Sequence, residues 1–166
     1  MTDTASLSAA IVSLLEVRRE TVATAESLTG GLVCAALVDA PGASAVVNGG
    51  VIAYDARIKA ELLSVNESMI ASNGTVDAGV AHEMAEGVRD RLGATWGLST
   101  TGVAGPDPAE GKPVGTVFIA VAGPEADAAR ALALSGDRRS IRDSTVVEVL
   151  SLLLATLEEQ SGSADS

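Results

Sequence analysis

The stretch TVATAESLTGGLVCAALVDA, residues 21–40, decides the fold that the rest of the chain must complete. Its first five residues, 21–25, are short and mostly apolar, which is typical of a buried strand. Residues 29–40 have helical character and end at Pro41-Gly42, a pair that stops helices. The stretch therefore predicts a strand that passes through a polar, glycine-containing junction directly into a helix.

The remainder of the chain alternates between helix-length and strand-length segments. Apolar residues at helical spacing predict helices, and short β-leaning apolar runs predict strands. We expect helices over residues 6–19, 56–65, 76–93 and 140–159, and strands over 50–55, 96–102, 115–123 and 130–136.

This alternation predicts a single-domain α/β fold, a three-layer α/β/α sandwich with a mixed, mostly parallel sheet. A mixed sheet is favoured because the adjacent strands 115–123 and 130–136 could pair as an antiparallel hairpin. We expect the domain to occupy residues 1–160. The polar end SGSADS, residues 161–166, is expected to be a disordered tail.

Composition limits the classes of partner. The chain has 166 residues, a net charge of −11 and only 2% aromatic residues, so its core must be aliphatic. An acidic surface argues against nucleic acid and against anionic membranes as partners. It leaves room for a small phosphorylated ligand, since one arginine or one helix N-terminus can hold a phosphate.

Cysteine and histidine are too few for a disulfide framework or a Cys/His zinc site. The single cysteine, Cys34, is expected to pack in a helix, and the single histidine, His82, to lie on a helix flank. We therefore expect neither a metal nor a cofactor. The start of the chain has no signal peptide pattern, and the apolar run 149–157 is too short to span a bilayer, so a cytoplasmic location is predicted.

Ser27 and Lys59 each allow a structural and a chemical interpretation. Ser27 precedes a helix and could serve as its N-cap, as could Thr29. Alternatively it is a nucleophile, which needs a base, and a lysine desolvated beside a hydroxyl can serve. Lys59 could be that base or simply an ion-pair partner for Asp55 four residues earlier. Tyr54, the chain's lone tyrosine, ends the predicted strand 50–55.

Two further loops carry groups suited to anions. TGVAGP, residues 101–106, follows a predicted strand, and such a turn lets backbone N–H groups approach an anion; it could equally be a plain tight turn. The segment GPDPAEGKP fails as a Walker A loop in its spacing and in Pro113. Arg138, after Gly136-Asp137, could clamp a phosphate or be a surface charge at a helix start.

Together, the motifs TAESLTGG, PGASAVVNGGVIAY, TTGVAGP, KPVGTVFIAVAG and SGDR resemble the C-terminal domain of the CinA competence/damage-inducible family. Standing alone, that domain resembles bacterial nicotinamide-nucleotide amidohydrolase, also called NMN deamidase. The resemblance covers roughly residues 5–155, with five motifs in the same order. The full-length relatives carry an additional N-terminal domain.

The resemblance implies hydrolysis of nicotinamide mononucleotide to nicotinate mononucleotide and ammonia, without a metal. It also implies a nucleophilic role for Ser27, with assistance from Tyr54 and Lys59. Thr101 and Arg138 match residues attributed to substrate binding or catalysis, and we add Gly102 beside Thr101. The turn at Thr29, Gly30 and Gly31, at a helix N-terminus, is expected to hold either the oxyanion or the phosphate.

Two other functions stay open on the sequence. One is a non-catalytic nucleotide-binding regulatory module, and the other is an amidase for a different small amide. The loop PDPAEGKP, residues 106–113, looks shorter than in many relatives and could shape the pocket and its preference. The resemblance also implies a homo-oligomer.

Overall fold

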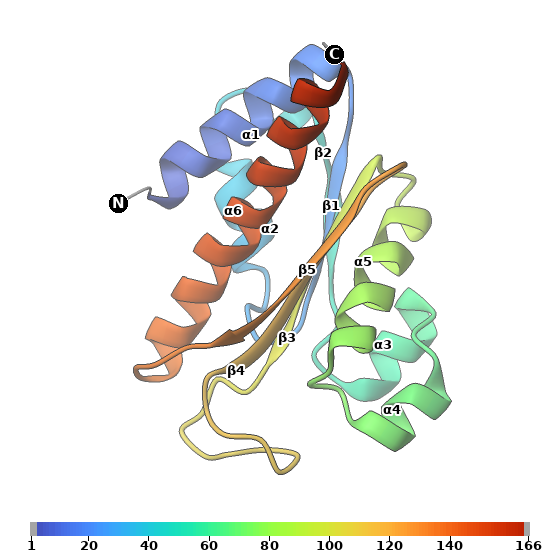
Figure 1. The fold of residues 1–166 in the computed structure, drawn as a ribbon, viewed down its shortest axis with the longest axis vertical. Helices are drawn as coiled ribbons and strands as arrows, with labels where there is room; N and C mark the ends of the chain where they lie inside the picture. Colours follow the sequence, from blue (N-terminus) through green and yellow to red (C-terminus); the bar gives the residue numbers. More distant parts are fainter. Residues whose placement is uncertain (1–2, 165–166) are drawn as a thin grey trace.

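A five-stranded mixed sheet with the strand order β2-β1-β3-β4-β5 forms the middle layer of the protein (Figure 1). The computed structural model describes residues 3–164. The strands are β1 (Val22–Glu26), β2 (Val47–Ile52), β3 (Trp96–Gly102), β4 (Thr116–Ala122) and β5 (Asp127–Ala133). Strand β1 is parallel to β2 and to β3, whereas β3–β4 and β4–β5 are antiparallel. The predicted mixed sheet and its β4–β5 hairpin are confirmed.

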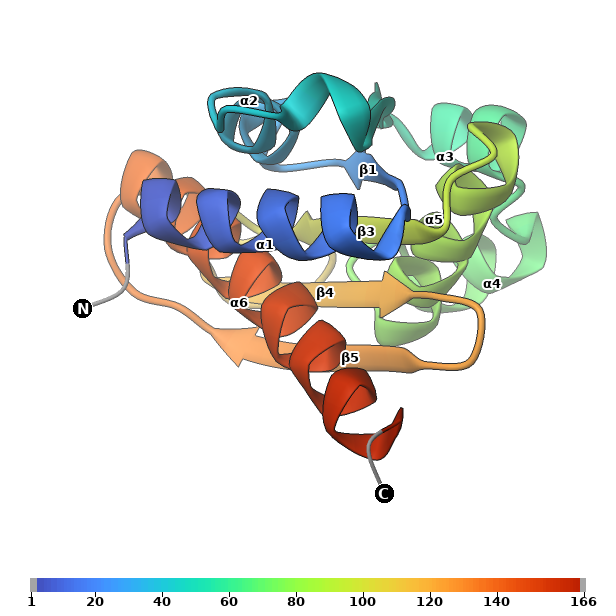
Figure 2. The same cartoon turned by 90° about the horizontal axis from the view of Figure 1, so that it is seen from above.

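Helices cover both faces of the sheet (Figure 2). One face carries α1 (Thr4–Arg18), α2 (Leu32–Val38) and α6 (Arg138–Ala164), and the other carries α3 (Ala56–Leu63), α4 (Glu67–Asn73) and α5 (Ala78–Arg91). A short 3₁₀ helix spans Ala43–Ala45. This arrangement is the expected three-layer α/β/α sandwich.

The position of β1 in the sheet explains why its sequence is mostly apolar. All five of its residues are buried, because it lies between two strands and under helices on both faces. The larger core cluster packs α1, α2 and α6 on the sheet, and a smaller one packs α3 and α5. The core is aliphatic, as expected, apart from the buried Trp96, whose indole N–H donates to Glu20 at 2.7 Å.

Several elements differ from the sequence prediction, among them β5, which spans Asp127–Ala133 where residues 130–136 were expected, and α2, which spans Leu32–Val38 where residues 29–40 were expected. Strand β2 begins at Val47 and ends at Ile52, so Tyr54 follows the strand instead of ending it. Helix α4 was not expected, although Asn66 caps it by accepting from the N–H groups of Ser68 and Met69. Residues 161–164, expected in a disordered tail, continue α6; residues 165–166 lie outside the described residues.

Within residues 3–164, no helix combines the length and the apolar character that a membrane span requires.

Candidate active site

The site forms where β1, β2 and β3 end at the same edge of the sheet, the lower edge in Figure 1. Ser27 directly follows β1, and Tyr54 follows β2 by two residues. Thr101 lies at the end of β3, and Arg138 begins α6. Parallel strands present their carboxyl ends together, so groups far apart in sequence converge at this edge.

The central contact joins Ser27 and Lys59. The Nζ atom of Lys59 lies 2.8 Å from Ser27 Oγ, 2.7 Å from the carbonyl oxygen of Ala53 and 3.2 Å from that of Tyr54. Asp55 caps α3 by accepting from the Arg57 N–H, which sets the helix start so that Lys59 points toward β1. As an amine, Lys59 can donate two protons to the carbonyls and accept the serine proton with its lone pair.

Burial makes the amine of Lys59 unusually ready to lose its proton. Its side chain is 1% exposed, and within residues 3–164 no carboxylate oxygen lies within ion-pairing distance of Nζ. Burial lowers the pKa of Lys59 from 10.5 to about 8, while the charges of Glu110 and Asp55 act in the opposite direction. The direct ion pair with Asp55 that the spacing allowed is therefore not formed.

Neither Ser27 nor Thr29 caps helix α2. The N-cap position is Gly31, without a side-chain cap, and the carboxylate of Glu26 accepts from the N–H groups of Val33 at 2.8 Å and Cys34 at 3.0 Å. Glu26 is 1% exposed, and the Thr24 hydroxyl donates to it at 3.2 Å. The carboxylate of Glu26 therefore caps α2. The hydroxyl of Ser27 is not needed as a cap and contacts Lys59 instead.

Replacing Glu26 by alanine should lower the free energy of unfolding by about 3 kcal/mol, because two buried N–H groups lose a charged acceptor. Glu26→Gln should cost less, since its amide oxygen still accepts one of the two bonds. Urea unfolding monitored by circular dichroism measures both. Glu16→Ala, at an exposed position of α1, is the matched control and should stay within about 0.5 kcal/mol of the parent. Equal losses for Glu26→Ala and Glu16→Ala would contradict the capping role.

The turn after Ser27 leaves backbone donors beside the hydroxyl. Gly30 and Gly31 adopt φ values of 57° and 107°, which a residue with a side chain rarely adopts. The Gly30 N–H donates to the Ser27 carbonyl, whereas within residues 3–164 the N–H groups of Leu28 and Thr29 have no acceptor. Buried N–H groups seldom stay unpaired, so these two are candidate donors to a bound group.

Hydroxyls of β3 fix the position of that turn. The Ser27 N–H donates to the Thr100 carbonyl at 3.0 Å, and the hydroxyls of Thr29 and Thr100 lie 2.8 Å apart. Thr29, which we predicted to contact substrate, is fully buried, and its hydroxyl is hydrogen-bonded to that of Thr100. Only its backbone remains for a ligand.

Arginines of α6 approach the site from the other side of the turn. Arg138 is exposed and donates to the hydroxyl of Tyr54 at 3.1 Å and to the carbonyl of Gly105. Arg142, one helical turn on, donates to the carbonyls of Leu28 at 2.8 Å and Thr29 at 3.3 Å. The Leu28 carbonyl shares its peptide with the Thr29 N–H, so Arg142 holds one side of a peptide whose N–H is unpaired within residues 3–164. The next peptide, whose carbonyl is that of Thr29, donates through the Gly30 N–H to the Ser27 carbonyl.

The structure brings Tyr54 and Arg138 together, and both lie at the rim of the site. The Tyr54 hydroxyl contacts Arg138, and its backbone carbonyl contacts Lys59, but no hydrogen bond in the described chain joins its hydroxyl to Ser27. Tyr54 is 62% exposed, so its ring can contact a ligand at the mouth of the site.

Thr101 and Gly102 hold the neighbouring loops. The buried Thr101 hydroxyl donates to the Thr75 carbonyl at 2.8 Å, and Gly102 pairs with Val117 on β4. Thr101 therefore positions the segment before α5, and its hydroxyl is occupied by that contact. The 103–115 loop that follows contacts this segment, since Glu110 accepts from the N–H groups of Thr75 and Val76.

Three residues of this site were missed in the sequence: Glu26, Thr100 and Arg142. A carboxylate before a helix is a capping signal, and Arg142 lies four residues after Arg138 on the same helix face. Both signals were therefore available. Thr100 carried none, because its role depends on strand register.

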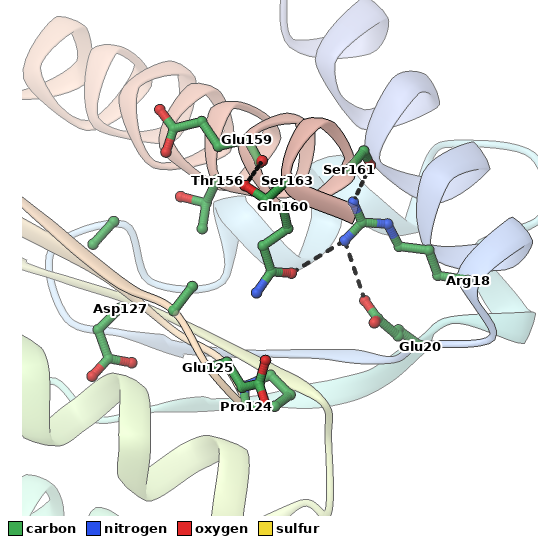
Figure 3. A pocket seen from close by; sticks show the side chains of 12 residues that line it. Arg18, Glu20, Pro124, Glu125, Asp127, Thr156, Glu159, Gln160, Ser161 and Ser163 are labelled. Atoms are coloured by element: carbon green, nitrogen blue, oxygen red, sulfur yellow. Dashed lines mark hydrogen bonds and ion pairs between the residues drawn. The ribbon is translucent and has the colours of Figure 1, made fainter. Parts of the chain in front are cut away.

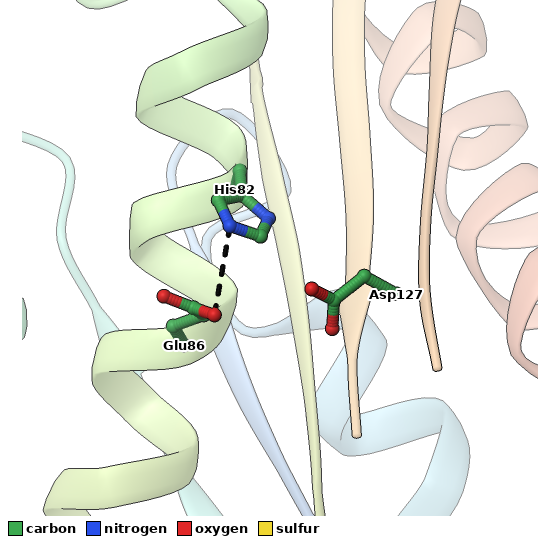
Figure 4. A group of neighbouring side chains, drawn as sticks. All are labelled: His82, Glu86 and Asp127. Atoms are coloured by element: carbon green, nitrogen blue, oxygen red, sulfur yellow. Dashed lines mark ion pairs between the residues drawn. The ribbon is translucent and has the colours of Figure 1, made fainter. Parts of the chain in front are cut away.

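Within residues 3–164, one group of side chains, from α5 and β5, could hold a metal ion (Figure 4). His82 and Glu86 of α5 and Asp127 of β5 offer three ligand atoms within 4.8 Å of one another, and His82 Nε2 lies 3.5 Å from Glu86 Oε1. His82 lies on a helix flank, as expected. Cys34 is half-buried at the start of α2, where burial raises the pKa of its thiol.

A hollow of about 860 Å³ opens at the opposite end of the sheet (Figure 3). It lies between the end of α1, the β4–β5 hairpin and the end of α6. Its arginine, Arg18, is already bound to Ser161 and Gln160 and lies 3.7 Å from Glu20. The hollow shares no residue with the Ser27 site, and at its rim Arg18 joins α1 to α6.

Comparisons with known proteins agree on one family. The family model described as "CinA C-terminal domain" matches residues 4–157. A CinA-like protein of Frankia casuarinae is 50% identical over 148 residues, covering 89% of this chain and 34% of the relative. A putative competence-damage inducible protein of Geobacillus is 46% identical over 147 residues, covering 88% and 35%. The chain thus spans about a third of the length of these curated relatives.

Solved structures agree with this assignment. The competence/damage inducible protein CihA of Agrobacterium tumefaciens superposes with a TM-score of 0.90 at 32% identity, covering 94% of this chain and 96% of the other. A competence-damaged protein (CinA) superfamily protein of Escherichia coli gives 0.89 at 29% identity, covering 93% and 92%. The likeness extends over nearly the whole length of both chains, so the fold described here is that of the matched structures.

Proposed function

Because this chain belongs to the CinA C-terminal domain family, we propose that it is an amidohydrolase that converts nicotinamide mononucleotide to nicotinate mononucleotide and ammonia. The observation that carries the proposal is the 2.8 Å contact between Ser27 Oγ and the buried amine of Lys59. A serine beside a desolvated lysine is an activated nucleophile, and acyl transfer from an amide is the chemistry that such a pair performs.

The first half of the reaction is acylation of the serine. Neutral Lys59 takes the proton of Ser27 as Oγ attacks the carbonyl carbon of the carboxamide, and the carbonyl becomes an oxyanion. The unpaired N–H groups of Leu28 and Thr29 donate to that oxyanion. The carbon–nitrogen bond then breaks, and the ammonium of Lys59 returns its proton to the leaving nitrogen, which departs as ammonia.

The second half is hydrolysis of the acyl-serine. Lys59 takes a proton from water, whose oxygen attacks the ester carbon. The oxyanion again lies on the backbone N–H groups, and the bond to Ser27 Oγ breaks. Lys59 returns that proton to the serine oxygen, and the product acid gives its remaining proton to solvent water and leaves as a carboxylate.

Arg138 is our proposed phosphate ligand. Two of its contacts hold it at the mouth of the site, and a guanidinium carries five N–H donors, so donors remain for a phosphate. Its positive charge offsets the repulsion between a phosphate and a chain of net charge −11. The ring of Tyr54 stands beside it and can contact the ribose or pyridine.

The test is ammonia release from nicotinamide mononucleotide by the purified protein, with the nicotinate product identified by mass spectrometry. Nicotinamide riboside, nicotinamide and glutamine complete the panel. We expect the phosphorylated substrate to give the highest kcat/KM and the riboside at least about tenfold less, since it lacks the group that Arg138 binds. Turnover of unphosphorylated amides alone would indicate a different amidase. Thermal stabilisation by the nucleotide without turnover would indicate a binding module.

The homo-oligomeric state and the cytoplasmic location expected from the sequence belong to this proposal, as does the absence of a metal from the reaction. Sedimentation velocity of the purified chain tests the first. Full ammonia release after exhaustive chelation tests the last.

A further inference from the structure

The side chain of Glu110, in the 106–113 loop, hydrogen-bonds to residues 75 and 76 of another loop. Its carboxylate accepts from the Thr75 N–H at 2.8 Å, the Thr75 hydroxyl at 2.8 Å and the Val76 N–H at 2.9 Å. These bonds cross 34 or 35 positions of sequence and tie two loops that are also joined by the Lys112 ammonium, which donates to the Asn73 carbonyl at 3.2 Å.

The local backbone is shaped to admit this carboxylate. Gly74 has a φ of 77°, and a Cβ added there would lie 2.7 Å from a carboxylate oxygen of Glu110. Glu110 itself has a φ of 54°, which is uncommon for a residue with a side chain. Both features favour the same contact: Glu110 adopts an uncommon backbone conformation, and Gly74 has no side chain that would collide with the carboxylate.

Hydrogen bonds connect the Glu110–Thr75 contact to the end of β3, which borders the Ser27 site. Thr75, held by Glu110, accepts through its carbonyl the hydrogen bond of Thr101 at the end of β3. The carboxylate also acts electrostatically on Lys59, where its charge favours the ammonium. Burial raises the pKa of Glu110, but the bonds from Thr75 and Val76 outweigh it and lower the pKa overall, so the group is ionised at neutral pH.

Other charges near Lys59 do not duplicate this effect. Asp55, on the helix that carries Lys59, acts in the same direction, and its side chain caps that helix. Glu26 on β1 is bound by the amides of α2, and Arg138 on α6 is bound to Tyr54 and Gly105. Unlike Asp55, Glu110 lies on a loop separate from the helix that carries Lys59. The position of that loop therefore determines how strongly the charge of Glu110 acts on Lys59.

We propose that Glu110 is a positioning residue of the Ser27–Lys59 site: its carboxylate latches the 106–113 loop onto residues 74–76, and this latch holds a negative charge at a fixed position beside the site. The catalytic consequence rests on the proposed amidohydrolase function, but the latch and the electrostatic effect do not.

Nuclear magnetic resonance tests the electrostatic effect without any substrate. The chain has two lysines, Lys59 and Lys112, so selective ¹³C labelling gives two resonances, and Lys112→Arg assigns them. In Glu110→Gln, we expect the Lys59 midpoint to fall by roughly half a pH unit, because a nearby negative charge is lost. Asp107→Asn removes an exposed charge from the same loop and is the matched control. Equal midpoints in the parent, Glu110→Gln and Asp107→Asn would overturn the proposal.

Glu110→Asp separates the latch from the charge. It keeps the carboxylate but shortens its reach by one methylene, so we expect faster hydrogen exchange at the Thr75 and Val76 amides with a Lys59 midpoint near the parent's. Unchanged exchange in both Glu110→Asp and Glu110→Ala would refute the latch.

In the amidohydrolase assay, Glu110→Asp should raise KM several-fold, whereas Glu110→Gln should also move the acidic limb of the pH profile downward. If Lys59 shifts but no amide is hydrolysed, the inference stands and the proposed function fails. If hydrolysis occurs but its acidic limb is the same in Glu110→Gln as in the parent, the inference fails and the proposed function stands.

Discussion

Ser27→Ala should reduce kcat for amide hydrolysis by at least about 10³-fold with little change in KM. Alanine removes the hydroxyl that lies 2.8 Å from the amine of Lys59 and leaves the anion-binding groups in place. Water activated by Lys59 can replace the serine only poorly, because it is not held at the position of Oγ. Steady-state ammonia release from nicotinamide mononucleotide measures the loss.

Two comparisons make this result specific to Ser27. Ser44→Ala changes an exposed serine in the 3₁₀ helix and should keep parental kcat and KM. Rapid quenching of the parent enzyme should give an acyl adduct on the peptide that contains Ser27, in which the nicotinoyl group still carries its ribose phosphate. A Ser27→Ala variant with activity within tenfold of the parent would exclude the serine as nucleophile and favour direct attack by water.

The second large effect is expected at Lys59, through both its identity and its protonation. Only the neutral amine can take the proton of Ser27. With a pKa of about 8, Lys59 is mostly charged below that pH, so kcat/KM should rise tenfold per pH unit below 8 and level off above it. The profile of ammonia release between pH 5.5 and 9.5, about the range in which such a base titrates, tests the sign and the midpoint.

Substitution at Lys59 tests the same point without relying on pH. Lys59→Arg keeps a positive charge but stays protonated, so it cannot act as a base, and we expect a loss of about 10³-fold with no limb near pH 8. Lys59→Met should lose as much. Lys112→Arg, at the other lysine, should behave as the parent. Substantial activity in Lys59→Arg, with the limb retained, would show that another group is the base.

The two largest predictions concern activity, whereas the Glu26 prediction concerns stability, and this division follows the structure. Glu26 and Ser27 are adjacent, yet the Glu26 carboxylate accepts from the amides of α2, whereas the Ser27 hydroxyl contacts Lys59. Neighbouring side chains of an extended chain point in opposite directions. A junction of strand, carboxylate, hydroxyl and two glycines therefore builds a helix cap and a reactive oxygen side by side.

The sequence by itself determined the kinds of element and the class of fold. Runs such as residues 96–102 carry their own strand signal, and β3 spans those same residues. The order of helices and strands along the chain then leaves a sandwich as the compact solution. Weak local signals gave the errors: residues 47–49 read poorly as strand because of glycine, and α4 is short and has no fully buried residue.

What only the tertiary structure decided is which groups meet. Ser27 and Lys59 are 32 positions apart, Glu110 and Thr75 are 35, and Arg142 and Leu28 are 114. Local pattern fixes how a backbone segment folds, but contacts at such separations depend on strand order and register, to which every segment contributes. The low proton affinity of Lys59 has the same origin, since a lysine loses water only when the rest of the chain closes around it.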